Sequence, residues 1–334
     1  MENLIERVLQ GDRRALARAI SIVEDDGDDA RRLLMALYPH TGRGYVIGVT
    51  GAPGTGKSTL VNDMAKEYRK RGLRVGIIAI DPTSPFSGGA LLGDRVRMKD
   101  LSGDSGIFIR SMATRGSLGG LAKATSDVIM VMDAAGYDRI IVETVGVGQA
   151  EVDIASEAHT TIVVESPGLG DEIQAIKAGI LEIADIFVVN KADREGADHT
   201  VMALKMMLGL SPKQVAHHGK VMTTGEAERK EGWVPPIIKT VAIRNEGTEE
   251  LIAEIERHRR YLQESGQLEE RELKRTQTDI TNALQNLFLE NLLSRITQSE
   301  WTEAVRQVAG RQMDPYSKAA EMLEKHGIAD LDGG

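Results

Sequence analysis

The 334-residue sequence contains no cysteine, which excludes disulfide bonds, thiolate metal sites and cysteine nucleophiles together. Aromatic residues make up only 4% of the chain, so a packed core must rest on isoleucine, valine, leucine, methionine and alanine. No run of about 18 apolar residues occurs, and we therefore expect no membrane-spanning segment. The N-terminus is charged and amphipathic, without the apolar stretch or cleavage site of a signal peptide, so we expect a cytoplasmic protein.

An excess of positive charge is also missing. The chain has 50 acidic residues against 41 lysines and arginines, which gives a formal net charge of −9. The basic residues are dispersed and mostly alternate with acids. Such a surface repels nucleic acid and anionic membranes, so we expect neither as a partner.

Short apolar runs alternate with helical patterns between residues 43 and 264. The runs are typical of buried strands and cover Tyr45–Thr50, Arg74–Ile80, Gly106–Ser111, Arg139–Thr144, Thr160–Ser166, Asp185–Asn190 and Pro236–Ala242. Helical patterns follow several of them, at Lys57–Arg71, Leu118–Ala135, Glu172–Ile183, Ala197–Leu208 and Thr248–Gln263. Continuous apolar strands separated by helices predict an α/β fold with a mostly parallel sheet covered on both faces.

Helical patterns flank this central region on both sides. Residues 1–42 carry apolar positions at helical spacing up to a break at Pro39 and Gly42. Residues 265–334 are charged and helical, with an apolar stripe that must be buried on the chain's own core or on a second subunit. We therefore predict three parts: an N-terminal helical segment (1–42), a central domain (43–264) and a C-terminal helical arm (265–334).

A glycine-rich segment, GAPGTGKS, runs from Gly51 to Ser58 between an apolar strand and a helical pattern. It matches the P-loop, in which glycines let successive backbone N–H groups face a phosphate and the next helix points its positive end at the anion. Lys57 supplies a point charge for the outer phosphates, and Ser58 supplies a hydroxyl for Mg²⁺. The predicted nucleotide contacts in this segment are Gly51, Ala52, Pro53, Gly54, Thr55, Gly56, Lys57, Ser58 and Thr59.

The choice of base is predicted by the sequence NKAD, which begins with Asn190 and Lys191 and ends with Asp193. A carboxylate at Asp193 can accept hydrogen bonds from the ring N–H and the exocyclic amino group of guanine. Adenine lacks both donors and would leave the carboxylate unpaired, at a cost of about 1–3 kcal/mol. Alone, NKxD could be a helix cap, but after a P-loop and at the end of a strand it predicts GTP and GDP binding. Ala242 is a further candidate for a backbone contact with the base.

Carboxylates between these motifs are candidates to hold Mg²⁺. Asp81 ends a predicted strand and Asp94 lies in the loop that follows, so either could bind the metal or its waters. The alternative is that Asp81 shapes an Asp-Pro turn and Asp94 caps the helix of residues 95–101. Glu143 lies in ETVG, where GTPases sense the γ-phosphate and the N–H of Gly146 is the natural contact; a buried salt bridge is the alternative for Glu143.

ETVGVGQ, DPTSPFSGGALLGDRVRM and NKAD together resemble the MeaB/ArgK-type P-loop GTPases, with glutamate where aspartate is more familiar in the first motif. The resemblance runs from about Ile5 to Tyr261. It implies a GTPase that acts as a chaperone, gating cofactor loading and protection of an adenosylcobalamin-dependent acyl-CoA mutase such as methylmalonyl-CoA mutase. It also implies that the C-terminal arm forms a homodimer.

The same resemblance makes Ser166–Lys177 a switch loop that communicates with the mutase. Its apolar residues Leu169, Ile173 and Ala175 differ from the common pattern, which favours a mutase acting on isobutyryl-, 2-hydroxyisobutyryl- or ethylmalonyl-CoA. No glutamine directly follows ETVG, so we expect slow intrinsic hydrolysis that the partner accelerates. The predicted catalytic residues are Lys57, Asp94, Arg97, Glu143 and Lys177, and the predicted metal ligands are Ser58, Asp81, Asp94 and Glu143.

Two other functions stay open from the residues. A metallochaperone GTPase would deliver nickel or zinc, but the chain has no cysteine and its paired His217 and His218 rarely suffice for a metal. A small-molecule kinase would need an acceptor pocket and a general base near the γ-phosphate. NKAD argues against the kinase, because such kinases mostly use ATP.

Overall fold

The computed structural model describes residues 1–81, 99–101, 103–113, 120–144, 157–168, 182–209, 214–217, 220–223 and 232–326. The chain divides into two compact units, Met1–Arg275 and Thr276–Gly334. Helix α11 (Gln267–Arg295) runs through this division. The predicted three-part division of the chain stays a prediction.

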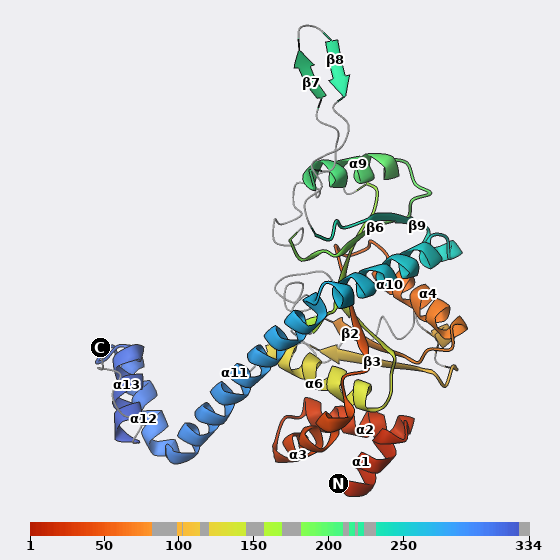
Figure 1. Cartoon of the computed structure of the whole chain (residues 1–334). Coiled ribbons are helices and arrows are strands. Elements are labelled where there is room, and N and C mark those ends of the chain that lie inside the picture. Colours follow the sequence, from red (N-terminus) through yellow and green to blue (C-terminus); the bar gives the residue numbers. More distant parts are fainter. Residues whose placement is uncertain are drawn as a thin grey trace. The chain divides into compact units, whose positions relative to one another are not determined.

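A sheet of seven parallel strands forms the centre of the first unit (Figure 1). The strands are β1 (Tyr45–Thr50), β2 (Val75–Asp81), β3 (Ile107–Ala113), β4 (Arg139–Thr144), β5 (Thr160–Glu165), β6 (Ile186–Asn190) and β9 (Ile237–Thr240). They lie in the order β3-β2-β4-β1-β5-β6-β9, which confirms the predicted α/β fold class and all seven predicted strands. Strands β2, β3 and β4 lie on one side of β1, and β5, β6 and β9 lie on the other, so the direction in which strands are added reverses beside β1. In open α/β sheets, ligands bind at the carboxyl ends of the strands next to such a switch point.

Helices cover both faces of the sheet. Successive residues of a strand point to opposite sides, and apolar residues on both sides pack against helices. In β1, Ile47 and Val49 pack with α4 (Lys57–Lys70) and α10 (Thr248–Glu264). Val46 points the other way, into the core formed with α6 (Gly120–Ala134) and the N-terminal helices. Helix α9 (Ala197–Met207) packs on β6 through residues of a third cluster. Strands β1, β4, β5 and β6 are therefore buried along their whole length, as the continuous apolar runs predicted.

Three helices make up most of the N-terminal segment: α1 (Glu2–Leu9), α2 (Arg13–Glu24) and α3 (Asp28–Leu37), followed by the short η1 (Tyr38–His40). The side chain of Asp12 caps α2 by accepting from the N–H groups of Arg14 and Ala15. Asp133 of α6 accepts from the N–H groups of Gly42 and Gly44 at 2.6 and 2.7 Å, which ties the end of this segment to the sheet layer directly before β1.

A β-hairpin and a short helix after β9 were not predicted. Strands β7 (Gln214–His217) and β8 (Lys220–Thr223) form an antiparallel hairpin in the segment between α9 and β9. Helix η3 (Ala242–Arg244) follows β9 and leads into α10. A further short helix, η2 (Lys99–Leu101), falls within residues 95–101, which were the alternative helix considered for Asp94. No helix within the described ranges is both long and apolar enough to cross a membrane.

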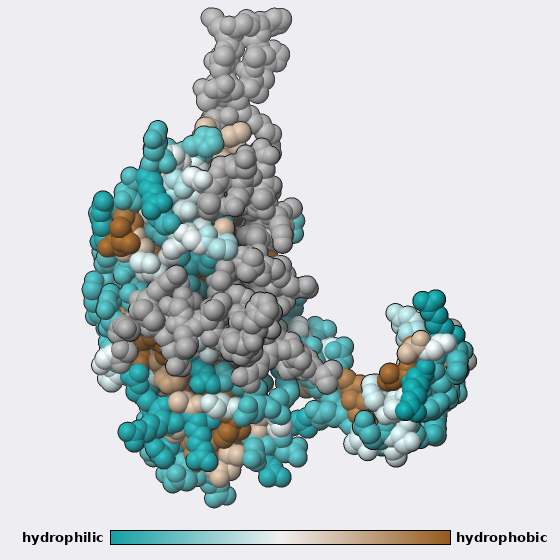
Figure 2. Space-filling view, turned by 180° about the vertical axis from the view of Figure 1, so that it is seen from behind, coloured by the Kyte–Doolittle hydropathy of each residue, from teal (hydrophilic) through white to brown (hydrophobic). Residues whose placement is uncertain are grey.

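The second unit contains the later turns of α11, α12 (Gln298–Ala309) and α13 (Pro315–Lys325). A capping box between Thr297 and Glu300 starts α12, and Asp314 caps α13. Apolar side chains on these helices stay exposed, as Figure 2 shows. They include Ile280, Leu284, Leu287, Phe288, Leu293, Trp301, Val305 and Tyr316.

Candidate functional site

The P-loop connects β1 to α4 at the carboxyl edge of the sheet. Gly51 has a φ of +137°, and a Cβ there would lie 2.1 Å from the carbonyl oxygen of Val164 in β5. Gly56 has a φ of +94°, and a Cβ there would lie 2.4 Å from Nδ2 of Asn190. Both positions therefore require glycine, because the loop is folded tightly against its neighbours. The sequence placed this loop correctly.

Lys57, the first residue of α4, is only 5% exposed. Its Nζ donates to the carbonyl oxygens of Gly51 and Ala52 at 2.7 and 3.0 Å. These contacts hold the ammonium group inside the curve of the loop, at the positive end of the helix. A phosphate bound there meets a fixed positive charge and the helix N-terminus together.

Ser58 and Glu143 meet under the P-loop. The Ser58 hydroxyl donates to Oε1 of Glu143 at 2.6 Å, and Glu143 in β4 is 3% exposed. Thr144, the next residue of β4, donates to the Thr50 hydroxyl of β1 at 3.0 Å, which fastens the two strand ends to each other. A hydroxyl and a carboxylate are hard oxygen ligands of the kind that Mg²⁺ prefers, so this pair fits the predicted metal. In the structure Glu143 thus accepts a hydrogen bond from Ser58, and its role at the metal stays a prediction.

Asn190 ends β6 and is 2% exposed. Its amide nitrogen donates to the carbonyl oxygen of Thr55 in the P-loop at 2.8 Å. Its amide oxygen accepts from the hydroxyl of Thr240 and the N–H of Ala242, both at 3.1 Å. One side chain therefore joins three loops at the carboxyl edge. The sequence singled out Asn190 and Ala242, but not this bridging role of Thr55 and Thr240.

Lys191 and Asp193 follow in the turn after β6. Lys191 has a φ of +57°, and its Nζ donates to the carbonyl oxygen of Gly54 at 2.5 Å. Asp193 Oδ2 accepts from Nη2 of Arg244 at 3.3 Å. The NKAD segment and the P-loop thus lie together at the carboxyl edge of the sheet, as a nucleotide that spans phosphates and base requires. Arg244 was missed, because nothing in the sequence marks one arginine in η3 as a partner of Asp193.

Several predicted residues lie outside the described residues. They are Asp94, Arg97, Gly146, Lys177 and nearly all of the predicted switch loop, of which Ser166–Gly168 are described. Asp81 is described as the last residue of β2, which places its backbone at the carboxyl edge with the P-loop. The roles predicted for these residues stay predictions.

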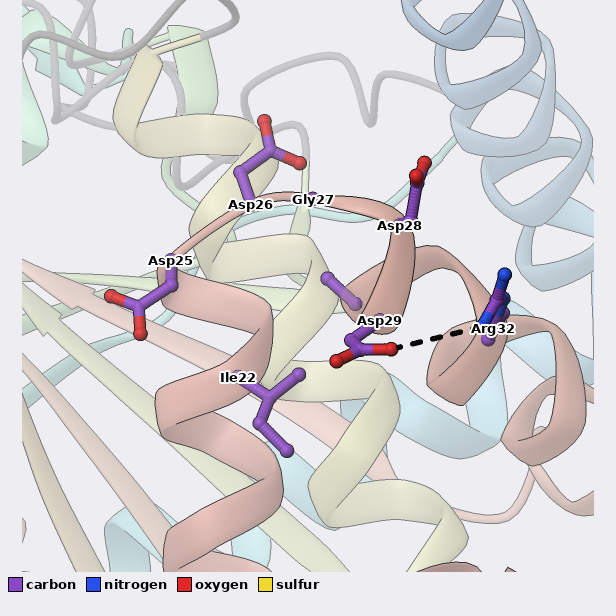
Figure 3. Close-up of a pocket in the computed structure, with 8 residues that line it drawn as sticks. Ile22, Asp25, Asp26, Gly27, Asp28, Asp29 and Arg32 are labelled. Carbon is purple, nitrogen blue, oxygen red and sulfur yellow. Dashed lines mark ion pairs between the residues drawn. The ribbon is translucent and has the colours of Figure 1, made fainter. Parts of the chain in front are cut away.

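The hollow in Figure 3 lies between α2 and α3, in the helical layer, and not at the carboxyl edge of the sheet. Asp25, Asp26, Asp28 and Asp29 line it, and their side chains point in different directions. Asp26 is paired with Lys123 at 2.7 Å, and Asp29 contacts Arg32 at 4.0 Å. The acidic rim of this hollow repels phosphates, so the nucleotide site does not lie here. In the part of the chain that the structure covers, no three His, Asp or Glu residues are grouped to hold a metal ion.

Comparisons with known proteins agree with this geometry. The family model described as methylmalonyl Co-A mutase-associated GTPase MeaB matches residues 16–300. This chain belongs to the MeaB family. The predicted resemblance is therefore confirmed, and with it the assignment as a GTPase that binds guanine nucleotides.

Individual members of the family match most of the chain. A putative GTPase of Pyrococcus abyssi is 52% identical over 325 residues, which cover 97% of this chain and 96% of that protein. A Mus musculus protein, methylmalonic aciduria type A homolog, mitochondrial, is 30% identical and covers 97% of this chain and 79% of its own length. A crystal structure described as LAO/AO transport system kinase has a TM-score of 0.67 at 25% identity and covers 97% of both chains. This MeaB-family chain therefore shares its fold with that crystal structure over nearly the whole length of both chains.

Proposed function

We propose that the chain binds GTP in the crevice at the carboxyl edge and hydrolyses it to GDP and phosphate, with Asp193 reading guanine. The observation that carries this proposal is the bridge made by Asn190, which joins the P-loop to the loops after β6 and β9. Phosphate-binding and base-binding segments are held in one arrangement, so the site is organised for a whole nucleotide. Calorimetric titration with GDP and ADP tests it: we expect GDP to bind and ADP not to bind.

Ser58 and Glu143 would hold Mg²⁺ with its waters, and the metal would neutralise charge on the outer phosphates. Lys57 would add its charge from inside the loop, and the helix N-terminus would orient the phosphates. Removing the metal with EDTA is expected to abolish turnover. A Glu143→Gln variant keeps the size of the side chain but removes its charge, so it should need more Mg²⁺ for half-maximal turnover, with little change in GDP affinity in excess Mg²⁺.

The physiological role proposed is that of a chaperone whose nucleotide state gates cofactor loading and protection of an adenosylcobalamin-dependent acyl-CoA mutase. Its support is the family: the matched model is described as mutase-associated, and the mouse relative is named for methylmalonic aciduria. We propose slow intrinsic hydrolysis that the mutase accelerates. Phosphate release measured with and without the cognate mutase tests this, and the absence of both acceleration and complex formation would remove the mutase from the proposal.

We also propose a homodimer formed by the C-terminal unit. Ile280, Leu284 and Leu287 recur at intervals of four and three along α11 and are 57%, 63% and 51% exposed. This spacing forms one stripe, and a second copy of the same helix is the partner that such a stripe fits. Sedimentation equilibrium should give twice the chain mass. A Leu284→Lys, Leu287→Lys variant should be monomeric, whereas a dimer that survives both changes would show that another surface is used.

A further inference from the structure

An arginine outside the nucleotide motifs contacts the carboxylate proposed to read guanine. Nη2 of Arg244 lies 3.3 Å from Oδ2 of Asp193, with side-chain exposures of 55% and 29%. Exposed pairs of this kind add little to folding stability. The position of this pair is therefore of more interest than its contribution to stability, because the contact is made to one of the two oxygens that would meet the base.

Arg244 is held in place by the same connections that hold the guanine motif. Strands β6 and β9 are paired with Asn190 opposite Thr240, and the N–H of Ala192 donates to the carbonyl oxygen of Thr240 at 3.0 Å. The N–H of Ala242 donates to the Asn190 side chain at 3.1 Å, so the start of η3 is tied to the end of β6. Arg244 closes this short helix two residues later. Its guanidinium group therefore approaches Asp193 from a fixed backbone.

Guanine would use both oxygens of Asp193 at once, one for the ring N–H and one for the exocyclic amino group. The terminal torsion of an aspartate is soft, so a free carboxylate rotates out of the plane of the base. Each carboxylate oxygen can accept more than one hydrogen bond. Arg244 can occupy one acceptor direction of Oδ2 and leave the other to the base.

We propose that Arg244 is a positioning residue for base specificity: it orients the Asp193 carboxylate so that both oxygens meet guanine, and it thereby favours guanine over bases that lack the exocyclic amino group. This inference rests on the proposed contact between Asp193 and guanine. Arg244 itself touches neither the phosphates nor the metal in this account, so its loss should change base selection and not the chemical step.

The test compares GDP with inosine diphosphate, which keeps the ring N–H but lacks the exocyclic amino group. In an Arg244→Ala variant, calorimetry should show GDP binding weakened about three- to fivefold, the range of an exposed charge pair. Binding of inosine diphosphate should change less than about 1.5-fold, within the variation expected for substitutions away from a contact. The preference for guanine would then fall. Equal weakening of both nucleotides, or no change in either, would overturn the inference.

A matched control is Arg257→Ala. Arg257 is an exposed arginine of α10 that pairs with Glu254, with a side chain 51% exposed, and it should leave both affinities unchanged. An Arg244→Lys variant keeps the charge but loses the planar fork of nitrogens, so it should restore the preference only in part. Full restoration would show that charge alone acts and would overturn the orienting role.

An Asp193→Asn variant separates the two proposals. If this change leaves GDP affinity intact, the proposed guanine contact fails, and the inference fails with it. If it weakens GDP binding while Arg244→Ala leaves the preference for guanine unchanged, only the inference fails. In the Asp193→Asn background, Arg244→Ala should have no further effect on GDP binding, because the two residues act through one contact. An undiminished effect in that background would contradict the mechanism.

Discussion

The two ends of strand β6 carry different kinds of polar structure. At the carboxyl end, Asn190 joins three loops through hydrogen bonds, in a crevice that a nucleotide would complete. At the amino end, Asp185 lies in a network of contacts between protein groups. Its carboxylate accepts from Thr161 N–H at 2.8 Å and from both terminal nitrogens of Arg271, at 3.1 and 2.9 Å. The carboxyl end is the one that we propose for the nucleotide, whereas Asp185 at the amino end is bound by groups of the protein itself.

Other buried groups extend the amino-end network. His258 of α10 is fully buried, with Nε2 3.3 Å from Oδ1 of Asp185 and Nδ1 2.8 Å from the Thr160 hydroxyl. The Tyr45 hydroxyl lies 2.6 Å from the same Thr160 oxygen. Since Arg271 belongs to the first turns of α11, this network fastens the start of that helix to the sheet. Changes at this end should therefore alter stability, and changes at the other end should alter function.

The largest effect is expected from Lys57→Met. The change removes the buried charge that would face the outer phosphates, and one such group contributes on the order of 100-fold to turnover. GTP turnover should fall by about that factor in a phosphate-release assay, with the urea midpoint nearly unchanged. Turnover within threefold of the unchanged protein would show that the charge at this position takes no part.

Asp185→Ala is expected to lower the stability of the fold and to leave nucleotide binding nearly unchanged. It leaves the guanidinium of Arg271 without its carboxylate, and breaking such a pair costs about 3 kcal/mol when one partner is partly exposed. Urea denaturation followed by circular dichroism should show this loss, while the folded protein should bind GDP with nearly unchanged affinity. The matched variant Asp185→Asn keeps an acceptor for Thr161 and should cost less. A strong loss of GDP binding in folded Asp185→Ala would show that the two ends are coupled.

Acid should weaken the amino end first. Burial, helped by nearby arginines, lowers the pKa of His159 to about 3, and burial lowers the pKa of His258 to about 4. An unfolded histidine titrates near 6.5, so below that pH the unfolded chain binds protons that the folded chain does not. Stability should fall as the pH drops from 6.5 towards 4, by up to about 1.4 kcal/mol per pH unit for each histidine.

Urea midpoints measured across this pH range test the expectation. His159→Asn should reduce the slope, whereas His199→Asn, at an exposed position of α9, should leave it unchanged. A slope that is the same in all three proteins would assign the acid sensitivity to other groups.

Features that depend on a few neighbouring residues could be predicted from the sequence. The strands and the P-loop follow from apolar runs, glycine spacing and a helix start, each contained in a few neighbouring residues. Asn190 and Asp193 could be found because they lie together in one short motif. The order of the strands did not follow, since it depends on which apolar edges meet in space.

Contacts between distant residues could not be predicted in the same way. Asp185 and Arg271 are far apart in the chain, and each looks like an ordinary charge beside a strand or on a helix. Arg244 reaches Asp193 only because β6 and β9 are neighbours in the sheet. The β7–β8 hairpin was missed as well, and His217 at the end of β7 was considered only as a candidate metal ligand.

The most direct test of the proposed guanine site is the choice of base by an Asp193→Asn variant. Replacing the carboxylate by an amide keeps one oxygen that can accept from the ring N–H and exchanges the other for an NH2 donor. This donor would face the exocyclic amino group of guanine, but it fits the extra carbonyl group of xanthine. Calorimetric titration of the unchanged and variant proteins with GDP and xanthosine diphosphate measures both affinities in one experiment. We predict that GDP binding falls and xanthosine diphosphate binding rises, with the fold intact. Unchanged GDP binding in the variant would contradict a guanine site at this edge of the sheet.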